Sequence, residues 1–352
     1  MAVEERRRVV VFGLGGTIAM SASEGGGVTP TLSAHELVLA VPGLTETGIE
    51  VEVVDFRRLP SASLDFATLT DLTSEISQAV ERGPSGVVVT QGTDTIEETS
   101  YLLDLYHRHP TPLVVTGAMR NPTMAGADGP ANLLAAVLTA AHPQSREYGA
   151  LVVLNDEIHA ARHVRKTHTT ALDTFRSPEI GPLGHLREGS VRLHGVRPPR
   201  LVIPPPISGA EPTVALHTVV LGDDPDILSR LAGPVDGLIV AAMGGGHVPD
   251  RLVEPLADAA TRIPVVLASR TGSGSVLRVT YGARGSERDL IGRGLIPAGT
   301  LDPLKARILL RALLACGADL SQLHQAFAVA GDYTDHSRWP WPYLYESESR
   351  NV

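Results

Sequence analysis

At 352 residues the chain is long enough for two domains with separate cores, and 43% apolar residues indicate a globular protein. Its 30 Lys and Arg against 39 Asp and Glu give a net charge of −9, which argues against a nucleic-acid or anionic-membrane partner. The single cysteine excludes an internal disulfide, and no apolar stretch is long enough for a signal sequence or a membrane span, so we expect a soluble, cytoplasmic protein.

Short apolar runs alternate with segments of helical periodicity through residues 1–196. The runs are rich in β-branched residues and do not alternate with polar ones, which is typical of strands covered on both faces. This order predicts a larger, N-terminal catalytic α/β domain with a mostly parallel sheet flanked by helices. The expected strands lie at 9–12, 51–56, 86–90, 112–117 and 149–155, and the expected helices at 64–82, 95–108 and 128–142.

A proline-rich stretch at 197–212 predicts a linker. The alternation then resumes, which predicts a smaller C-terminal α/β domain at 213–337. The tail at 338–352 combines aromatic residues, prolines and polar residues, and we expect it to strap the body and then fray. In the second domain the expected strands lie at 213–222, 237–246 and 263–274, and the expected helices near 248–261 and 303–316.

Ligands of open α/β sheets bind beyond the carboxyl ends of the strands, so the loops there are the informative ones. The first such loop, GLGGTIAM at 13–20, does not fit the G-x-G-x-x-G pattern of a dinucleotide site, and the segment 21–30 after it is not helical. What remains is the hydroxyl of Thr17 beside a glycine-rich turn. The alternative is that Thr17 merely starts the next element.

Thr93 and Asp94 follow the expected strand at 86–90. One interpretation is helix capping, with Asp94 as the N-cap residue and Glu97 as its reciprocal partner. The other is that the two side chains bind a polar ligand at the sheet edge and help to move a proton.

Lys166 follows the expected strand at 149–155. A solvated lysine is the ordinary interpretation, whereas a lysine beside a carboxylate and a hydroxyl can act as a general base. The nearby His159, His163 and His168 lack the carboxylate pattern of a convincing metal site.

Taken together, these stretches resemble the bacterial-type L-asparaginase (asparaginase/glutaminase) family. The matching pieces stand in the family's order and cover most of the chain from 9 to about 315. They are GGTIAM (15–20), QGTDTIEETSYLLDL (91–105), TGAMR (116–120), ADGPANLLAAV (127–137), LVVLNDEIHAARHVRKTHTTALDTFRSPEIGPLG (151–184) and AGTLDPLKARILL (298–310).

The resemblance implies a cofactor-free hydrolase that converts asparagine to aspartate and ammonia through a threonine nucleophile and an acyl-enzyme. It also implies active sites between the subunits of an intimate dimer, and a homotetramer built as a dimer of such dimers. Asp94 would pair with the α-ammonium of asparagine, while a hydroxyl and backbone N–H groups would receive its α-carboxylate. The catalytic residues implied are Thr17 as nucleophile with Thr93, Asp94 and Lys166, and the substrate-binding residues are Ser61, Gly92, Asp94 and, from the neighbouring subunit, Glu287.

The chain departs from the family pattern at three places. The family's loop tyrosine is absent, because the first tyrosine is Tyr101 and the corresponding position is near Val28. Gln91 stands where the family has a histidine, and GGGH at 244–247 replaces Gly-Asn-Gly-Asn. We expect the loop at 21–33 to be a mobile lid that closes weakly, because three consecutive glycines favour its open state, and the KM for asparagine to be high.

Two alternative functions remain open at this point. A broader asparaginase/glutaminase is one, because one methylene in a pocket is worth only about 1–3 kcal/mol. A non-catalytic amino-acid-binding regulatory protein is the other. The missing loop tyrosine favours it, and the joint presence of Thr17, Thr93, Asp94 and Lys166 opposes it.

Overall fold

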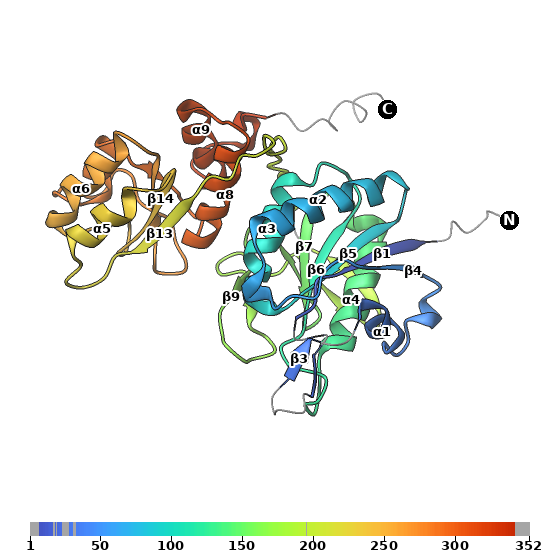
Figure 1. Ribbon diagram of the computed structural model, residues 1–352. Coiled ribbons are helices and arrows are strands. Elements are labelled where there is room, and N and C mark those ends of the chain that lie inside the picture. The colour runs from blue at the N-terminus through green and yellow to red at the C-terminus, as the bar shows by residue number, and fades with distance from the viewer. Residues whose placement is uncertain are drawn as a thin grey trace, which may run out of the picture. The chain divides into compact units, whose positions relative to one another are not determined.

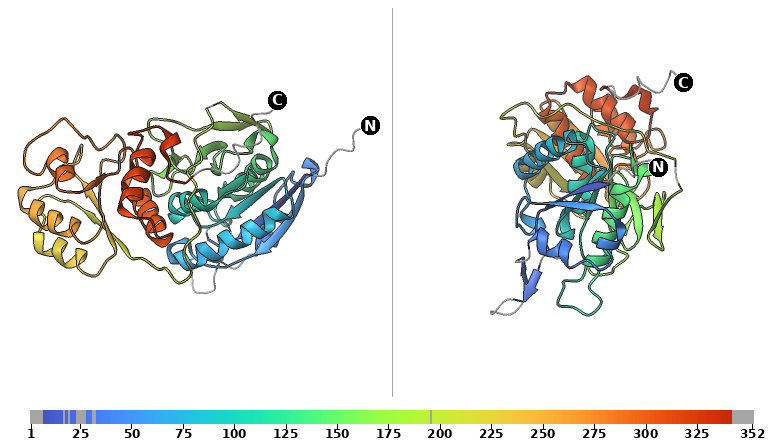
Figure 2. Two further views of the ribbon diagram at one scale, coloured as in Figure 1. Left: turned by 90° about the horizontal axis from the view of Figure 1, so that it is seen from above. Right: turned by 90° about the vertical axis from the view of Figure 1, so that its right-hand side faces the viewer.

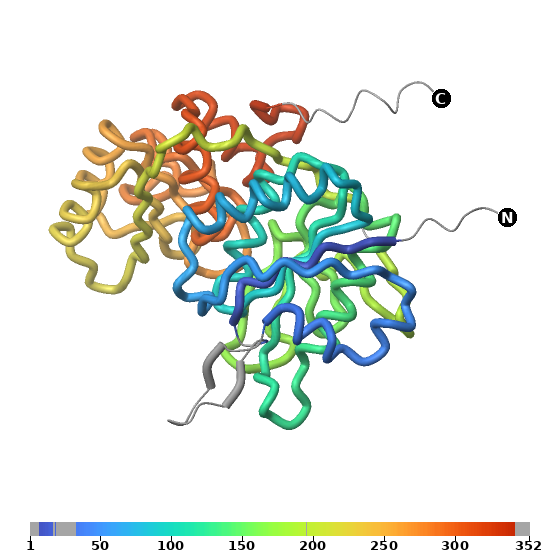
Figure 3. The backbone as a smooth tube through the Cα atoms, turned by 45° about the vertical axis from the view of Figure 1, so that its right-hand side comes forward, coloured from blue at the N-terminus to red at the C-terminus, as the bar shows by residue number. Residues whose placement is uncertain are grey.

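The structure is a computed structural model that describes residues 7–16, 18, 20–22, 28–30, 33–194 and 196–341. The chain forms two compact units, which divide between Arg200 and Leu201. Figure 3 follows the backbone from the blue start of the first unit to the red end of the second. Among the described helices, none is long and apolar enough to cross a membrane.

An eight-stranded sheet forms the centre of the first unit, in the order β12-β11-β8-β7-β6-β5-β1-β4 (Figure 1). Strands β4, β1, β5, β6 and β7 are parallel, and β8, β11 and β12 add an antiparallel edge. The predicted mostly parallel sheet is therefore confirmed. The strands are β1 (Arg8–Gly13), β4 (Glu50–Asp55), β5 (Gly86–Thr90), β6 (Leu113–Thr116), β7 (Ala150–Leu154), β8 (Glu157–Ala160), β11 (Gly184–Arg187) and β12 (Ser190–Leu193).

Helices cover both faces of this sheet (Figures 1 and 2). Helices α1 (Ala34–Leu39) and α4 (Gly129–Ala141) lie on one face, and α2 (Phe66–Glu81) and α3 (Ile96–Tyr106) lie on the other. Two short hairpins, β2 (Met20–Ala22) with β3 (Val28–Pro30) and β9 (Arg165–Lys166) with β10 (Phe175–Arg176), complete the unit.

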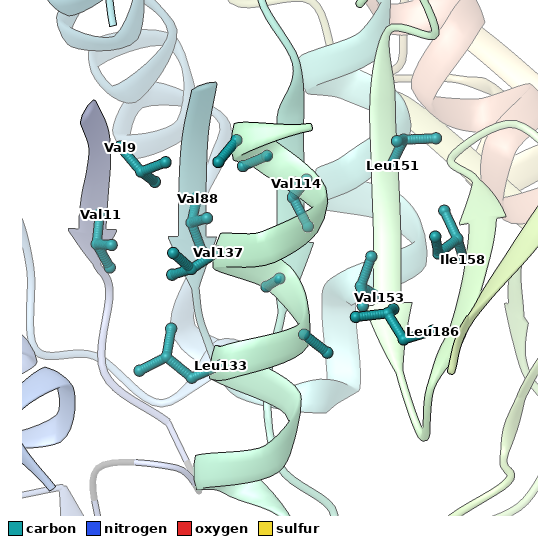
Figure 4. Packing of buried hydrophobic residues seen from close by; sticks show 14 of the residues in the cluster. Val9, Val11, Val88, Val114, Leu133, Val137, Leu151, Val153, Ile158 and Leu186 are labelled. Carbon is teal, nitrogen blue, oxygen red and sulfur yellow. The ribbon is translucent and has the colours of Figure 1, made fainter. Parts of the chain in front are cut away.

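The central strands are apolar throughout because each face meets a helix layer. Figure 4 shows Val9, Val11 and Val88 in the cluster under α4 with Leu133 and Val137 of that helix. Successive side chains of a strand point to opposite faces, so the residues between them face α2 and α3. All the core residues of β1 and β5 are buried, which is why the sequence shows unbroken apolar runs rather than alternation.

The second unit is built on a four-stranded parallel sheet in the order β13-β14-β15-β16. Helix α8 packs against β13, β14 and β15, while α5 and α6 pack on each other and against β13 and β15. The smaller C-terminal α/β domain is therefore confirmed as a fold. Its elements are β13 (Val214–Thr218), α5 (Pro225–Ala232), β14 (Gly237–Ala242), α6 (Asp250–Ala260), β15 (Val265–Ser269), α7 (Glu287–Gly292), β16 (Ile296–Pro297), α8 (Pro303–Ala315) and α9 (Leu320–Ala330).

The segment from Leu201 onward is fastened to the second unit although it contains no helix or strand before β13. Val202 is buried, and its carbonyl accepts a 2.7 Å hydrogen bond from the indole N–H of Trp339, which is also buried. The N–H of Ile207 donates to the carbonyl of Ala315 at 2.8 Å. Trp339 thus holds the start of the tail against this unit, and residues 342–352 lie outside the described part of the chain.

Candidate active site

The loops after β1, β4 and β5 meet at one edge of the first sheet, because these strands are parallel neighbours. The N–H of Leu14, just past β1, donates to the carbonyl of Thr90 at the end of β5 at 2.9 Å. The carbonyl of Leu14 accepts the N–H of Leu59 at 2.8 Å. The glycine-rich turn after β1 is therefore held between the two neighbouring loops.

Two glycines allow these loops to approach each other closely. Gly16 has φ 89°, and a Cβ there would lie 2.0 Å from the backbone nitrogen of Gly92. A Cβ on Gly92 would lie 2.6 Å from the hydroxyl oxygen of Ser61. Any side chain at either position would push the loops apart.

Ser61 is buried and ties the loop after β4 to the loop after β5. Its Oγ accepts the N–H of Asp94 at 3.3 Å, and its carbonyl accepts the hydroxyl of Thr95 at 3.2 Å. The predicted substrate-binding residues Ser61, Gly92 and Asp94 therefore lie together.

Lys166, in the short strand β9, reaches the same place. Its Nζ donates to Thr93 Oγ1 at 2.9 Å and to Asp94 Oδ1 at 2.7 Å. The Lys166 side chain is 15% exposed, whereas that of Asp94 is 66% exposed. An ion pair with so open a carboxylate contributes at most about 1 kcal/mol to stability. Its main effect is to hold a cation, a buried hydroxyl and an accessible carboxylate in one group.

Capping by Asp94 is not what the structure shows. A 3₁₀ turn at Thr93–Thr95 precedes α3, which begins at Ile96, and neither element has a side-chain cap at its start. The extra turn moves the helix start past Asp94, whose carboxylate binds Lys166 instead. The proposed reciprocal pair of Asp94 and Glu97 is therefore wrong.

Gln91 is a buried member of the site that the sequence analysis noted only as a departure. Its Nε2 donates to the carbonyl of Gly92 and to Thr95 Oγ1, both at 3.2 Å. Its Oε1 is buried without a partner among the described residues. The position directly after a buried strand was the available signal, because a residue there lies at the edge of the sheet where the loops meet.

Asp128 fixes the loop after β6 and was not singled out from the sequence. Its carboxylate oxygens accept the N–H groups of Met119 at 3.0 Å and Arg120 at 2.8 Å. Asn132 adds a bond from its Nδ2 to the carbonyl of Gly117 at 3.0 Å. The start of α4 thereby shapes a fourth loop at this edge of the sheet.

Two of the predicted site residues, Thr17 and Glu287, stay predictions. Thr17 lies outside the described residues, as does most of the loop expected to act as a lid, and for Val28 only the backbone is described. Glu287 belongs to the second unit and is fully buried there. Its Oε1 accepts the N–H groups of Thr280 at 3.1 Å and Tyr281 at 2.8 Å, and its Oε2 lies 3.3 Å from His247 Nε2. Its role toward a substrate stays a prediction.

Within the described ranges no group of three or more His, Cys, Asp and Glu side chains is arranged to hold a metal ion.

Two family models and several curated proteins match this chain. The family model "Asparaginase, N-terminal" matches residues 8–198, and "Glutaminase/Asparaginase C-terminal domain" matches residues 213–327. A probable L-asparaginase of Deinococcus radiodurans is 37% identical over 334 residues, covering 91% of this chain and 97% of its own. L-asparaginase 2 of Escherichia coli is 33% identical, covering 91% and 92%.

A solved structure extends the likeness to the fold. It is a probable cytoplasmic L-asparaginase of Campylobacter jejuni, with a TM-score of 0.80 and 28% identity, and the match covers 92% of this chain and 99% of that one. Both family domains and nearly the full length of these relatives are represented, so the chain belongs to the asparaginase family.

Proposed function

We propose that the protein hydrolyses L-asparagine to L-aspartate and ammonia without a cofactor. The observation that carries the proposal is the contact of one lysine Nζ with both Thr93 Oγ1 and Asp94 Oδ1 at the carboxyl edge of a parallel sheet. A hydroxyl, a base and an exposed carboxylate are the groups that amide hydrolysis of an amino acid needs. The family membership of the chain supports the same reaction.

The substrate's charged ends match the groups around Gly92. Asp94 is exposed and uses Oδ1 for Lys166, so its second oxygen is positioned to accept the α-ammonium of asparagine. The Ser61 hydroxyl and the backbone N–H groups of the turn at 93–95 would receive the α-carboxylate. Binding both ends fixes the side-chain amide relative to the sheet edge, which lowers the entropic part of the barrier.

The reaction proceeds in two halves under this proposal. The Thr17 hydroxyl attacks the side-chain amide carbon, the C–N bond breaks, and ammonia leaves with a proton, giving an acyl-enzyme. Water then attacks the ester and releases aspartate. The linked group of Lys166, Thr93 and Asp94 supplies the base that takes the proton from the attacking oxygen in each half. Backbone N–H groups at the start of α3 would stabilise the oxyanion.

The protein is proposed to act as a homo-oligomer, a dimer of intimate dimers, with Glu287 of one subunit serving the site of its neighbour. A cytoplasmic location stays a prediction. We likewise propose domain limits at 196 and 213, with a linker between them.

Ammonia release tests the function directly. We expect turnover with L-asparagine, and the ratio of rates with L-asparagine, L-glutamine and D-asparagine distinguishes a strict asparaginase from a broader amidohydrolase. No turnover with any of them, together with tight aspartate binding, would instead support the non-catalytic alternative.

Thr17→Ala tests the nucleophile. The variant should lose turnover by several powers of ten, because the proposed acyl-enzyme forms on the Thr17 hydroxyl, while it still binds aspartate in a calorimetric titration. Thr261→Ala, which changes an exposed threonine of the second unit, is the matched control. A Thr17→Ala enzyme with nearly unchanged rate would transfer the role to Thr93.

A further inference from the structure

A pocket of about 640 Å³ opens in the first unit beside the β9–β10 hairpin. Its wall includes Glu157 and His159 of β8 and Ser177, which directly follows β10. These three residues are not part of the proposed asparaginase machinery. They form a continuous hydrogen-bonded chain.

His159 is the centre of that chain. Its Nδ1 lies 2.9 Å from Ser177 Oγ, and its Nε2 lies 3.2 Å from Glu157 Oε2. An ionised carboxylate only accepts hydrogen bonds, so Nε2 carries the ring proton and donates it to Glu157. In the neutral ring Nδ1 is then an acceptor, and the Ser177 hydroxyl donates to it.

The surroundings keep His159 in the form that can take up a proton. The side chain is 1% exposed, and burial lowers the pKa of His159, although the neighbouring Glu157 carboxylate acts in the opposite direction. The imidazole is therefore neutral at neutral pH. A neutral imidazole bonded to a hydroxyl on one side and oriented by a carboxylate on the other is the general arrangement of an activated serine.

We propose that Ser177 is a second nucleophile of this protein, with His159 as its base and Glu157 as the group that orients His159, and that it takes acyl groups from small polar esters. Ser177 Oγ attacks the ester carbonyl carbon, and its proton moves to His159 Nδ1. The carbon–oxygen bond to the alcohol then breaks, and the alcohol leaves with that proton. Water, deprotonated by His159, releases the acid and restores Ser177.

This site differs from a serine protease triad in one respect. The two ring nitrogens are exchanged, since Nδ1 faces the serine and Nε2 faces the carboxylate. The roles do not depend on which nitrogen is used, because both lie in the ring plane and each has its partner within hydrogen-bond distance.

The pocket wall indicates the kind of ester. Nδ1 of His168 accepts the N–H groups of Thr170 and Ala171, both at 3.0 Å, so its proton lies on Nε2 and is a donor for a substrate oxygen. Arg176 and Asp173 both line the wall and form an ion pair with each other, and Thr167 adds a polar side chain. These groups suit a short acyl chain with a polar, hydrogen-bonding end and not a long hydrocarbon.

The proposal is tested with a fluorophosphonate probe, which transfers its phosphonyl group to an activated serine with loss of fluoride. The labelling is done on the full chain carrying Thr17→Ala, and the adduct is located by peptide mass spectrometry. Hydrolysis of p-nitrophenyl acetate by the same protein is followed in parallel. We expect an adduct on Ser177 that Ser177→Ala removes together with the esterase activity.

Glu157→Gln separates an activated serine from an accessible one. It keeps the size of the side chain and removes the charge that stabilises the imidazolium, so labelling should slow by at least about tenfold. Ser286→Ala, which changes a serine of similar burial whose hydroxyl donates to a backbone carbonyl, should leave labelling unchanged. Thermal melts confirm that each variant is folded. The same substitutions are also made in chains that keep Thr17, and their turnover of asparagine tests the proposed function separately. Absence of an adduct on Ser177, or equal labelling of wild-type and Glu157→Gln protein, would refute the proposal.

Discussion

At the scale of single residues, the contact between Gly92 and Ser61 decides how closely two loops can approach. Gly92 has φ −67°, which any residue can adopt, so its requirement for glycine is purely steric. A Cβ would lie 2.6 Å from Ser61 Oγ and 3.0 Å from Ser61 Cβ. Adding a methyl group would displace Ser61 and with it the backbone N–H of Asp94.

Gly92→Ala should therefore lower kcat/KM by at least about tenfold and destabilise the first unit by about 1–3 kcal/mol, the usual cost of overpacking. Adding Ser61→Ala removes the closest clash and should recover part of the stability but not the activity. Gly292→Ala is the matched control, because a Cβ there meets nothing within 4 Å. Urea unfolding and steady-state kinetics measure the two effects. Equal effects of Gly92→Ala and Gly292→Ala would contradict the steric explanation.

At the scale of secondary structure, the end of α3 depends on a buried neutral histidine. The N–H of His107 bonds to the carbonyl of Leu103, and its Nε2 lies 2.7 Å from the carbonyl of Thr111. Burial, with a smaller contribution from the charge of Arg200, lowers the pKa of His107 to about 3. In the unfolded chain the same side chain has a pKa of about 6.5.

Between these two values the unfolded chain binds more protons, so the free energy of unfolding falls as the pH falls from about 6.5 toward 3. The contribution of His107 amounts to about 2 kcal/mol between about pH 7 and about pH 5. His107→Gln can still donate a hydrogen bond to the carbonyl of Thr111. Urea unfolding should show that the free energy of unfolding of this variant falls by about 2 kcal/mol less than that of the wild type between about pH 7 and about pH 5. The exposed His336→Gln is the control. A loss of stability as large as in the wild type would contradict a neutral His107. Burial raises the pKa of Asp104, so this carboxyl makes the free energy of unfolding rise as the pH falls, opposite to His107. The test therefore compares the pH dependence of the wild type with that of His107→Gln.

The sequence predicts the central strands well because they are short, β-branched and buried on both faces. Gly86–Thr90 agrees with the expected strand at 86–90 to the residue. The antiparallel edge strands β8, β11 and β12 were missed, because runs such as GHLR and SVRL are short and half polar. Helix α9 was also missed, although Asp319 and Gln322 form a capping box at its start.

The candidate site is predictable only in part. Thr93 and Asp94 stand out by their place after a buried strand, but Lys166 is more than seventy residues further along the chain, and spacing alone cannot show that it reaches them. The resemblance to a family supplied that link. The 3₁₀ turn before α3 was not foreseen, because Asp94 and Glu97 fit a capping box equally well by sequence. The contacts of Thr95 with Gln91 and Ser61 depend on that turn.

At the scale of the whole molecule, exposed apolar side chains support self-association of the second unit. Leu221, in the loop after β13, is 96% exposed, and Val279, in the loop after β15, is 79% exposed. Both loops follow the carboxyl ends of parallel strands, so they emerge at the same edge of the second sheet. We expect this edge to be covered by another copy of the chain, since closed symmetric assemblies are the usual form of oligomers.

Analytical ultracentrifugation should show a dimer or tetramer at assay concentration and activity that is lost on dilution into monomers. Leu221→Ser with Val279→Ser should weaken assembly without changing the thermal melt of the dissociated chain. Val196→Ser changes a valine that is 93% exposed in the first unit, and it should leave assembly intact. A fully active monomer would contradict both the proposed oligomer and the proposed role of Glu287 in the site of a neighbouring subunit. Glu287→Gln alone is a poorer test, because that carboxylate also holds the backbone at Thr280 and Tyr281.

The most direct test of asparagine hydrolysis by the linked group of Thr93, Asp94 and Lys166 is a kinetic double-mutant cycle. Steady-state ammonia release from L-asparagine is measured for the wild type, Thr93→Val, Lys166→Met and the double variant. Each single change should lower kcat by at least about a hundredfold, and the double variant should be little worse than either, because groups that act as a unit are non-additive. Losses that multiply in full, or a Lys166→Met enzyme close to the wild-type rate, would contradict a shared catalytic role.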